Sequence, residues 1–246
     1  MKYICFLISI LLFTQMGYTQ SFKNQQKQYE RVRFAYREAE KPVREMYKAN
    51  GIDTLSAYIF IRVFKQEKVL EVWAKEKSDT AYTHITDYKI CASSGQPGPK
   101  RIQGDGQVPE GFYHIDRFNP WSSFYLSLGL NYPNKSDRIL GDSNPGGDIF
   151  IHGSCATIGC IPITDEKIIE VYLMAVEAKN CGQANIPVHI FPARLSDELM
   201  AKLKTGDTEN EILQFWMNLK EGFDYFEKYK KLPVVTIDAK GKYIFK

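Results

Sequence analysis

The sequence predicts an α+β fold: a mostly antiparallel β-sheet or sandwich, preceded by an N-terminal helix and followed by a C-terminal helical extension. Three observations predict it. Residues 20–55 carry apolar side chains at helical spacing. Residues 56–195 consist largely of short strand-like runs joined by turns. Residues 196–246 return to helical spacing before a final short hairpin.

The first 19 residues have the order of regions found in a secretory signal. Lys2 is their only charge, and an apolar run follows from Tyr3 to Phe13. Gly17 and Thr19 then supply small residues for a signal peptidase. The apolar run is shorter than the about 20 residues that a membrane span requires. We therefore expect cleavage near Thr19 and a periplasmic or otherwise extracytoplasmic protein without a stable membrane span; an uncleaved anchor is the alternative.

The N-terminal helix is expected within residues 21–49, ending at Asn50-Gly51 and interrupted near Pro42. Its apolar stripe is weak, which suggests a helix packed on the main domain. The residues that define the stripe are Val32, Tyr36, Ala39, Val43 and Met46.

Apolar and β-branched runs predict the strands of the central segment, the first two joined as a hairpin by a polar turn. These runs occupy residues 58–64, 69–73, 83–92, 111–115, 148–152 and 187–191. Between them, residues 93–109 are rich in Gly and Pro, and residues 118–147 predict a long loop with at most short strands.

Helices are expected after each of three capping signals. Thr164-Asp165-Glu166 begins the clearest helix, which closes near residues 180–182. Ser196 and Thr208 begin two more, and a hairpin over residues 234–236 and 243–245 ends the chain.

Composition excludes several classes of protein. With 44% hydrophobic and 25% charged residues, the chain is an ordinary globular protein rather than a disordered one. Its 32 basic and 29 acidic side chains nearly cancel, and no stretch gathers Lys and Arg beside stacking aromatics. A nucleic-acid partner is therefore not expected.

Cysteine usage leaves the redox state open. Of five cysteines, Cys5 falls in the signal, and Cys91, Cys155, Cys160 and Cys181 would reach an oxidising compartment. Four cysteines permit three pairings, and a chain of this length can also bury a core without any.

Candidate chemistry concentrates between His152 and Cys160. Alternation along the strand places His152 on the face opposite Ile151, at a strand end. A thiol beside an imidazole can form a thiolate–imidazolium pair with a lowered cysteine pKa. Gly159-Cys160 suits a nucleophile better than Ser154-Cys155, because glycine permits a tight turn whose N–H groups can bind an oxyanion.

Spacing alone leaves other interpretations open. A cysteine and a histidine eight residues apart are more often structural than catalytic, so spacing alone favours a disulfide or a buried thiol, including a bond between Cys155 and Cys160. His152, Cys155 and Cys160 are only three soft ligands without a paired motif, so no metal is expected. Ser154 lacks the Gly-x-Ser-x-Gly context of a serine nucleophile. The remaining histidines, His84, His114 and His189, fall in expected strands and suit half-buried sheet positions.

His152-Gly153 at a strand end, followed by Thr157-Ile158-Gly159-Cys160 and a helix, resembles the signature of the L,D-transpeptidase catalytic domain family (YkuD-type). Within it, the chain is most similar to the murein L,D-transpeptidase-like subgroup with a shortened His-to-Cys loop. The resemblance covers about residues 56–195, and the tail with Phe215-Trp216 is similar as well. Other similar segments are 98–101, 104–106, 109–113, 131–134 and 146–153.

The resemblance implies a cysteine enzyme of cell-wall biogenesis and cell shape that acts on the stem peptides of bacterial peptidoglycan. By motif match, Cys160 is the nucleophile and His152 the general base. The backbone of Gly153 helps to orient the imidazole, and N–H groups near Gly159 and Cys160 form the oxyanion hole. No cofactor is implied.

Two departures from the family pattern concern the acceptor side of the site. Ile158 occupies a position where many members have a second histidine, and the spacing from His152 to Cys160 is shorter than usual. Transpeptidation is the expected reaction; hydrolysis that trims or releases wall-linked peptides or proteins is the alternative. A catalytically silent wall-binding domain is a third possibility.

Overall fold

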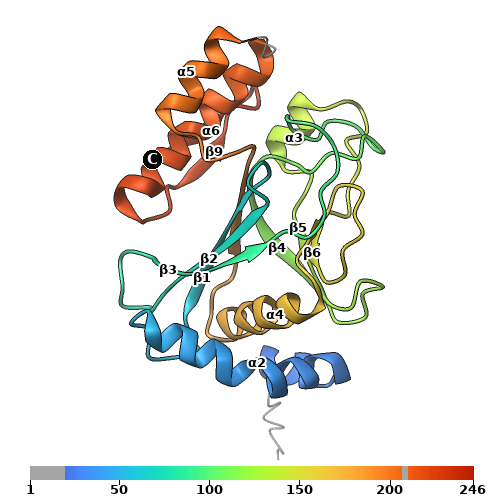
Figure 1. Cartoon of the computed structure of the whole chain (residues 1–246), viewed down its shortest axis with the longest axis vertical. Helices are drawn as coiled ribbons and strands as arrows, with labels where there is room; N and C mark the ends of the chain where they lie inside the picture. Colours follow the sequence, from blue (N-terminus) through green and yellow to red (C-terminus); the bar gives the residue numbers. More distant parts are fainter. Residues whose placement is uncertain (1–19, 207–209) are drawn as a thin grey trace, which may run out of the picture.

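The computed structural model describes residues 20–206 and 210–246, so the expected signal peptide and Thr208 lie outside the described residues. It has the predicted α+β class, with a curled eight-stranded sheet in the order β3-β2-β1-β8-β4-β5-β6-β7 (Figure 1). Neighbouring strands are antiparallel except for the parallel pairs β1–β8 and β6–β7. Among the described residues, no helix is both long and apolar enough to cross a membrane.

The predicted strands and most of the predicted helices are confirmed, with small shifts at their ends. The strands of the sheet are β1 (Tyr58–Phe64), β2 (Val69–Lys75), β3 (Thr83–Lys89), β4 (Gly111–Asn119), β5 (Ser127–Leu130), β6 (Phe150–His152), β7 (Ile161–Pro162) and β8 (Ile186–Phe191). A separate hairpin pairs β9 (Val235–Ile237) with β10 (Tyr243–Phe245). The helices are α1 (Phe22–Gln26), α2 (Glu30–Ala49), α3 (Lys135–Leu140), α4 (Asp165–Asn180), α5 (Asp197–Thr205) and α6 (Asn210–Tyr229).

The expected interruption at Pro42 is wrong, because α2 continues through this residue. Pro42 lies on the exposed face of the helix, where water can satisfy the carbonyl group that loses its N–H partner. The helical segment breaks earlier instead, between α1 and α2.

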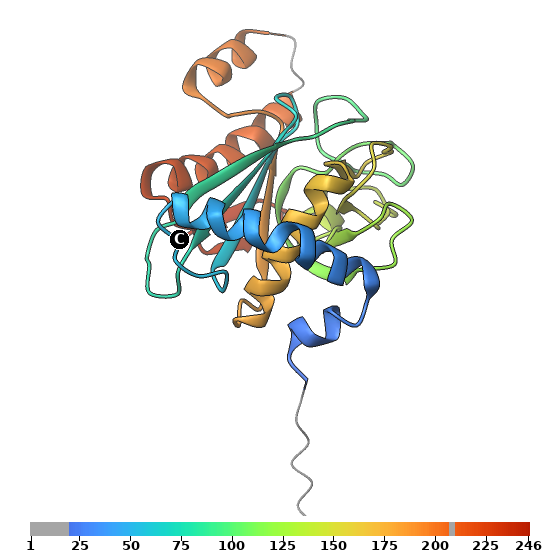
Figure 2. The same ribbon diagram turned by 60° about the horizontal axis from the view of Figure 1, so that its bottom comes forward.

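One face of the sheet is covered by α4, and α2 crosses over α4 on the outside (Figures 1 and 2). The sheet and both helices share the larger hydrophobic core, to which α2 contributes Val43, α4 contributes Leu173 and the sheet contributes Ile151. A buried hydrogen bond from Tyr36 Oη to Glu177 Oε1, 2.8 Å long, joins the two helices. The N-terminal segment is therefore packed on the domain, as predicted.

The opposite face carries the C-terminal extension. Phe223 of α6 packs with Phe64 and Phe191 of the sheet in a second apolar cluster. Trp216 of α6 donates its indole N–H to Glu110 Oε2 at 2.6 Å, and Lys65 neutralises the same fully buried carboxylate at 2.7 Å. This polar contact fixes α6 against the loop that precedes β4.

The segment over residues 118–147 contains the short strand β5, which the prediction allowed, and also the helix α3, which was not predicted. Asn134 and Asp137 form a reciprocal capping box that begins α3. Their three-residue spacing is the signal from which this helix could have been predicted. The two-residue strand β7 was also not predicted.

A disulfide joins Cys91 to Cys155 and leaves Cys160 and Cys181 as free thiols. This pairing contradicts the alternative in which Cys155 and Cys160 bond to each other. The bond ties the segment after β3 to the loop between β6 and β7, across a sequence separation of 64 residues.

Reduction of this disulfide is expected to lower the free energy of unfolding by about 4 kcal/mol, because the unfolded chain regains the conformational entropy that closure of the loop had removed. For a chain of this size that corresponds to a fall in Tm of about 10 °C. Thermal unfolding with and without a phosphine reductant measures it, and Cys181→Ala, which touches no disulfide, should leave Tm unchanged by comparison. An unchanged Tm on reduction would show that the bond does not constrain the unfolded chain.

Candidate active site

The parallel pairing of β6 with β7 brings His152 and Cys160 to one face of the sheet. Ile151 pairs with Ile161 and His152 with Pro162, so Cys160, one residue before β7, continues the register beside Phe150. Ile151 and Ile161 are buried in the core with α4. Alternation then directs His152, Phe150 and Cys160 to the other face. The two predicted catalytic residues therefore come from neighbouring chain segments on the same side.

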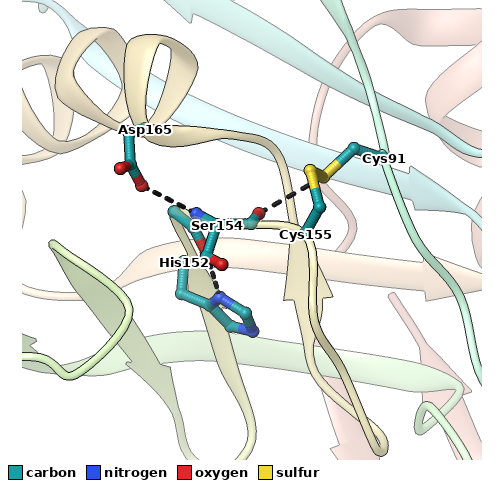
Figure 3. Close-up of a disulfide and its surroundings, with 6 residues drawn as sticks. Cys91, His152, Ser154, Cys155 and Asp165 are labelled. Carbon is teal, nitrogen blue, oxygen red and sulfur yellow. Dashed lines mark hydrogen bonds between the residues drawn. A yellow bond between two sulfur atoms is a disulfide. The ribbon is translucent and has the colours of Figure 1, made fainter.

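His152 is held as a neutral imidazole. The residue is 1% exposed, and its Nδ1 lies within hydrogen-bond distance of the Gly153 carbonyl oxygen (Figure 3). Because a carbonyl only accepts, Nδ1 carries the proton and Nε2 has the lone pair. Nε2 is buried without a hydrogen-bond partner in the described part of the chain. Burial lowers the pKa of His152, an effect that the bond to Gly153 opposes.

The imidazole is positioned by a loop that the N-terminal helix holds. The ring of Phe124 lies 4.5 Å from the ring of His152, centroid to centroid. Arg31 of α2 donates from Nη1 to the carbonyl oxygens of Ser122 and Tyr125, at 2.7 and 2.6 Å, on either side of Phe124. Helix α2 thus fixes the loop that packs on the candidate base.

Gly153 meets a steric requirement as well as contacting the imidazole. A Cβ at this position would lie 2.9 Å from the Phe124 carbonyl oxygen and would collide with the carboxylate of Asp165. That carboxylate accepts the N–H of Ser154 at 2.7 Å (Figure 3). The Cys91 sulfur lies 3.3 Å from the Ser154 carbonyl oxygen; since a disulfide sulfur carries no hydrogen, this is a packing contact.

The resting thiol of Cys160 is neutral, which differs from the predicted thiolate–imidazolium pair. Burial raises its pKa, and this outweighs a backbone hydrogen bond from Phe150 that lowers it. The thiol donates to the carbonyl oxygen of Asp148 at 3.6 Å. Within the described residues it forms no hydrogen bond with His152. The sequence analysis assigned a face to His152 alone, and it did not predict that His152 is buried and Cys160 partly buried, which disfavours both charges.

Alkylation of Cys160 by iodoacetamide is therefore expected to have its pH midpoint at or above that of an ordinary thiol, about 8.5. Since a neutral His152 contributes no charge, His152→Gln should leave the midpoint nearly unchanged. Mass spectrometry of the Cys160 peptide across a pH series measures both, with Cys181 in the same samples as an internal reference. A midpoint near 6 that rises in the variant would instead demonstrate an ion pair.

The turn before Cys160 is held by Thr157, a residue that the sequence analysis did not select. Its Oγ1 accepts the N–H of Cys160 and donates to the Cys160 carbonyl oxygen, both at 2.8 Å. A threonine three residues before the cysteine is the available signal, because such hydroxyls close local turns. The Cys160 N–H, predicted to help form the oxyanion hole, is thus occupied by Thr157 in the resting structure.

Gly159→Ala is expected to lower turnover by about 10²-fold, whereas Ile158→Ala should stay within a few-fold of wild type. Gly159 has φ of +120°, and a Cβ there would lie 3.0 Å from the Gln107 carbonyl oxygen. An added side chain would displace the turn and its N–H groups. The Ile158 side chain is 90% exposed and so is not part of the core. Turnover of both variants on one muropeptide, with folding checked by circular dichroism, tests this ranking; the reverse order contradicts it.

Cys160 borders a cavity of about 260 Å³, walled on one side by the C-terminal extension. Leu199 and Leu203 of α5 and Trp216 of α6 line it together with the cysteine. The loop over residues 93–97 and the ends of β1 and β8 complete the wall. Apart from Lys65, whose ammonium is bonded to Glu110, the lining carries no charged side chain.

None of the other candidate histidines lines the cavity beside Cys160. Across residues 20–206 and 210–246, no group of three or more His, Cys, Asp or Glu side chains is arranged to hold a metal ion. His84, His114 and His189 do fall in strands β3, β4 and β8. Only His114 is half-buried as expected, since His84 is exposed and His189 is buried.

Comparisons with known proteins agree with the motif. The sequence profile of the YkuD family, described as the L,D-transpeptidase catalytic domain, matches residues 58–190. A protein of Escherichia coli K12 named "Putative L,D-transpeptidase YafK" is 35% identical over 205 residues, which cover 82% of this chain and 78% of that protein.

Two solved structures are also similar. The helical cell shape determining protein Pgp2 from Campylobacter jejuni has a TM-score of 0.44 at 20% identity, over 74% of this chain and 73% of that one. Bd1075 from Bdellovibrio bacteriovorus has a TM-score of 0.39 at 21% identity, over 57% and 50% of the two chains. The profile match over more than half of the sequence, together with the E. coli relative, shows that the chain belongs to the YkuD family of L,D-transpeptidase catalytic domains.

Proposed function

We propose that this protein is a cysteine acyltransferase, an L,D-transpeptidase that cleaves peptidoglycan stem peptides through a thioester on Cys160. Family membership supports a peptidoglycan-related L,D-transpeptidase type of function. The observation that carries the finer assignment is the buried, unpartnered Nε2 of His152 on the same strand face as the free thiol of Cys160. A buried base without a partner is costly unless a reacting group completes it.

The first half of the reaction forms the thioester. Nε2 of His152 accepts the Cys160 proton as Sγ attacks the carbonyl carbon that precedes a D-centre of the stem, that of meso-diaminopimelate. Backbone N–H groups of the Gly159 turn stabilise the oxyanion, and the Cys160 N–H contributes once it leaves Thr157. Collapse of the intermediate breaks the amide C–N bond, and the imidazolium returns its proton to the leaving amine.

The second half transfers the acyl group. His152, again neutral, removes a proton from an incoming amine, whose nitrogen displaces Sγ to give a new amide and a free thiol. Water in place of the amine gives a carboxylate, which is the hydrolytic alternative. Both routes use the same two side chains and differ only in the acceptor.

The proposed site of action is extracytoplasmic. The disulfide between Cys91 and Cys155 supports this, because such bonds persist in oxidising compartments. The signal-like N-terminus provides the proposed route of export.

The test is mass spectrometry of purified muropeptides incubated with the protein from residue 20 onward. New cross-linked dimers support transpeptidation; tripeptides without dimers support hydrolysis. Intact-protein spectra should also show an acyl adduct that is absent from Cys160→Ala. Unchanged muropeptides and an unmodified protein whose Cys160 is a free thiol would reject both activities in favour of a silent wall-binding domain.

A further inference from the structure

A second cavity, of about 840 Å³, lies between the sheet, α3 and the C-terminal hairpin. It shares no lining residue with the cavity beside Cys160. Its volume is within the usual range for sites that bind small molecules, about 300–1,000 Å³. Phe112, Tyr113 and Tyr243 supply aromatic surface, and the polar lining consists of His114, Asn131, Asn134, Lys135, Arg138, Asn185 and His189.

The charge of this cavity is positive and unbalanced. Lys135 and Arg138 line it, whereas no Asp or Glu does. Arg138 forms no ion pair with any described residue. Lys135 donates one hydrogen bond from Nζ to the Ile237 carbonyl oxygen, at 2.8 Å. The neighbouring carboxylate of Asp137 accepts hydrogen bonds from Arg101 and Tyr113. Asp238 interacts electrostatically with Lys135, but its carboxylate already accepts two backbone N–H groups of its own turn.

Polar groups with free hydrogen-bonding capacity also line this cavity. His189 is 4% exposed, and its Nδ1 has no hydrogen-bond partner in the described part of the chain. Burial and the nearby Arg62 lower the pKa of His189 to about 3, so the ring is neutral and can donate one hydrogen bond and accept another. Asn131 accepts the His114 N–H through Oδ1, which leaves its NH₂ group to donate.

We propose that this cavity binds a carboxylate-bearing ligand, with its anionic group between Lys135 and Arg138 and its polar body against Asn131 and His189. Two cations three residues apart on α3, in a cavity whose lining has no acid, favour an anion, and a guanidinium holds a carboxylate through paired hydrogen bonds. Two sources share this chemistry. One is a peptidoglycan stem peptide, a choice that rests on the proposed function; the other is a free dicarboxylate, which does not.

The histidine side chains provide the test, because the sequence has only four and they report on separate places. Their NMR signals are followed in the Cys160→Ala protein during titration with the stem tetrapeptide, the same peptide with amidated carboxylates, and glutarate. His189 and His114 report on this cavity, His152 on the candidate active site and His84 on an exposed strand. We expect the His189 signal to move with the tetrapeptide, with glutarate or with both, and the amidated peptide to bind at least tenfold more weakly.

Variants of exposed residues complete the test. Arg138→Gln and Lys135→Gln should each weaken binding at His189 about tenfold, while Lys202→Gln, which removes a cation from α5, should not. Equal binding of the amidated peptide, wild-type affinity in Arg138→Gln, or no movement of His189 at millimolar ligand would overturn the proposal. A His152 signal that ignores the tetrapeptide would count against the proposed function and leave this cavity unaffected.

Discussion

Replacement of Cys160 by alanine is expected to reduce turnover by at least about 10⁴-fold, the largest effect of any single change in the chain. The thioester cannot form without Sγ. The measurement is the rate of product formation from a defined muropeptide, together with the acyl adduct in intact-protein spectra.

The matched control is Cys181→Ala, which removes the other free thiol. Cys181 follows α4, and its thiol is bonded to the Ala178 carbonyl oxygen at 3.2 Å, away from the candidate site. It should retain wild-type turnover. An active Cys160→Ala beside an inactive Cys181→Ala would mean that the wrong sulfur has been assigned.

Replacement of His152 by alanine is expected to lower turnover by about 10²–10⁴-fold, the usual contribution of a general base. The sign of the pH dependence follows from the protonation state. His152 must be neutral to accept the thiol proton, and burial lowers its pKa below the usual 6.5. Wild-type turnover should therefore rise with pH through a midpoint below 6.5 and remain high at neutral pH.

His84→Ala is the control, because His84 is exposed on β3 and pairs with Asp87 of the same strand. It should leave both rate and pH profile unchanged. The residual activity of His152→Ala should lack the acidic limb of the wild-type profile. A variant that keeps this limb would show that another group is the base.

The sequence predicted well what depends on local pattern. His152 ends a strand whose alternation determines its face, and the hairpins and the helix after Thr164 follow from spacing and turn residues. The raised pKa of Cys160 is different, because it comes first from desolvation of the thiol in the packed structure and then from the charge of Asp148. Desolvation of this kind has no signature in a single stretch of residues.

One error and one omission have specific physical causes. The interruption predicted at Pro42 ignored the possibility that the lost hydrogen bond faces water. The omission is Thr157, whose hydroxyl closes the turn on both backbone groups of Cys160. It was missed because turns made by side-chain hydroxyls leave the hydrophobic pattern unchanged.

The hydrogen bonds from Arg31 to the loop around Phe124 limit how this domain can be moved into a chimeric protein. A chimera that receives only residues 58–190, the span shared with the family profile, would carry His152 and Cys160 but not Arg31, and its Phe124 loop would no longer be tethered to α2. The same chimera would lack Leu199 and Trp216, which wall the cavity at the cysteine. Swaps between relatives should therefore exchange the helical ends together with the sheet, since the smallest portable unit extends beyond the segment that carries the signature.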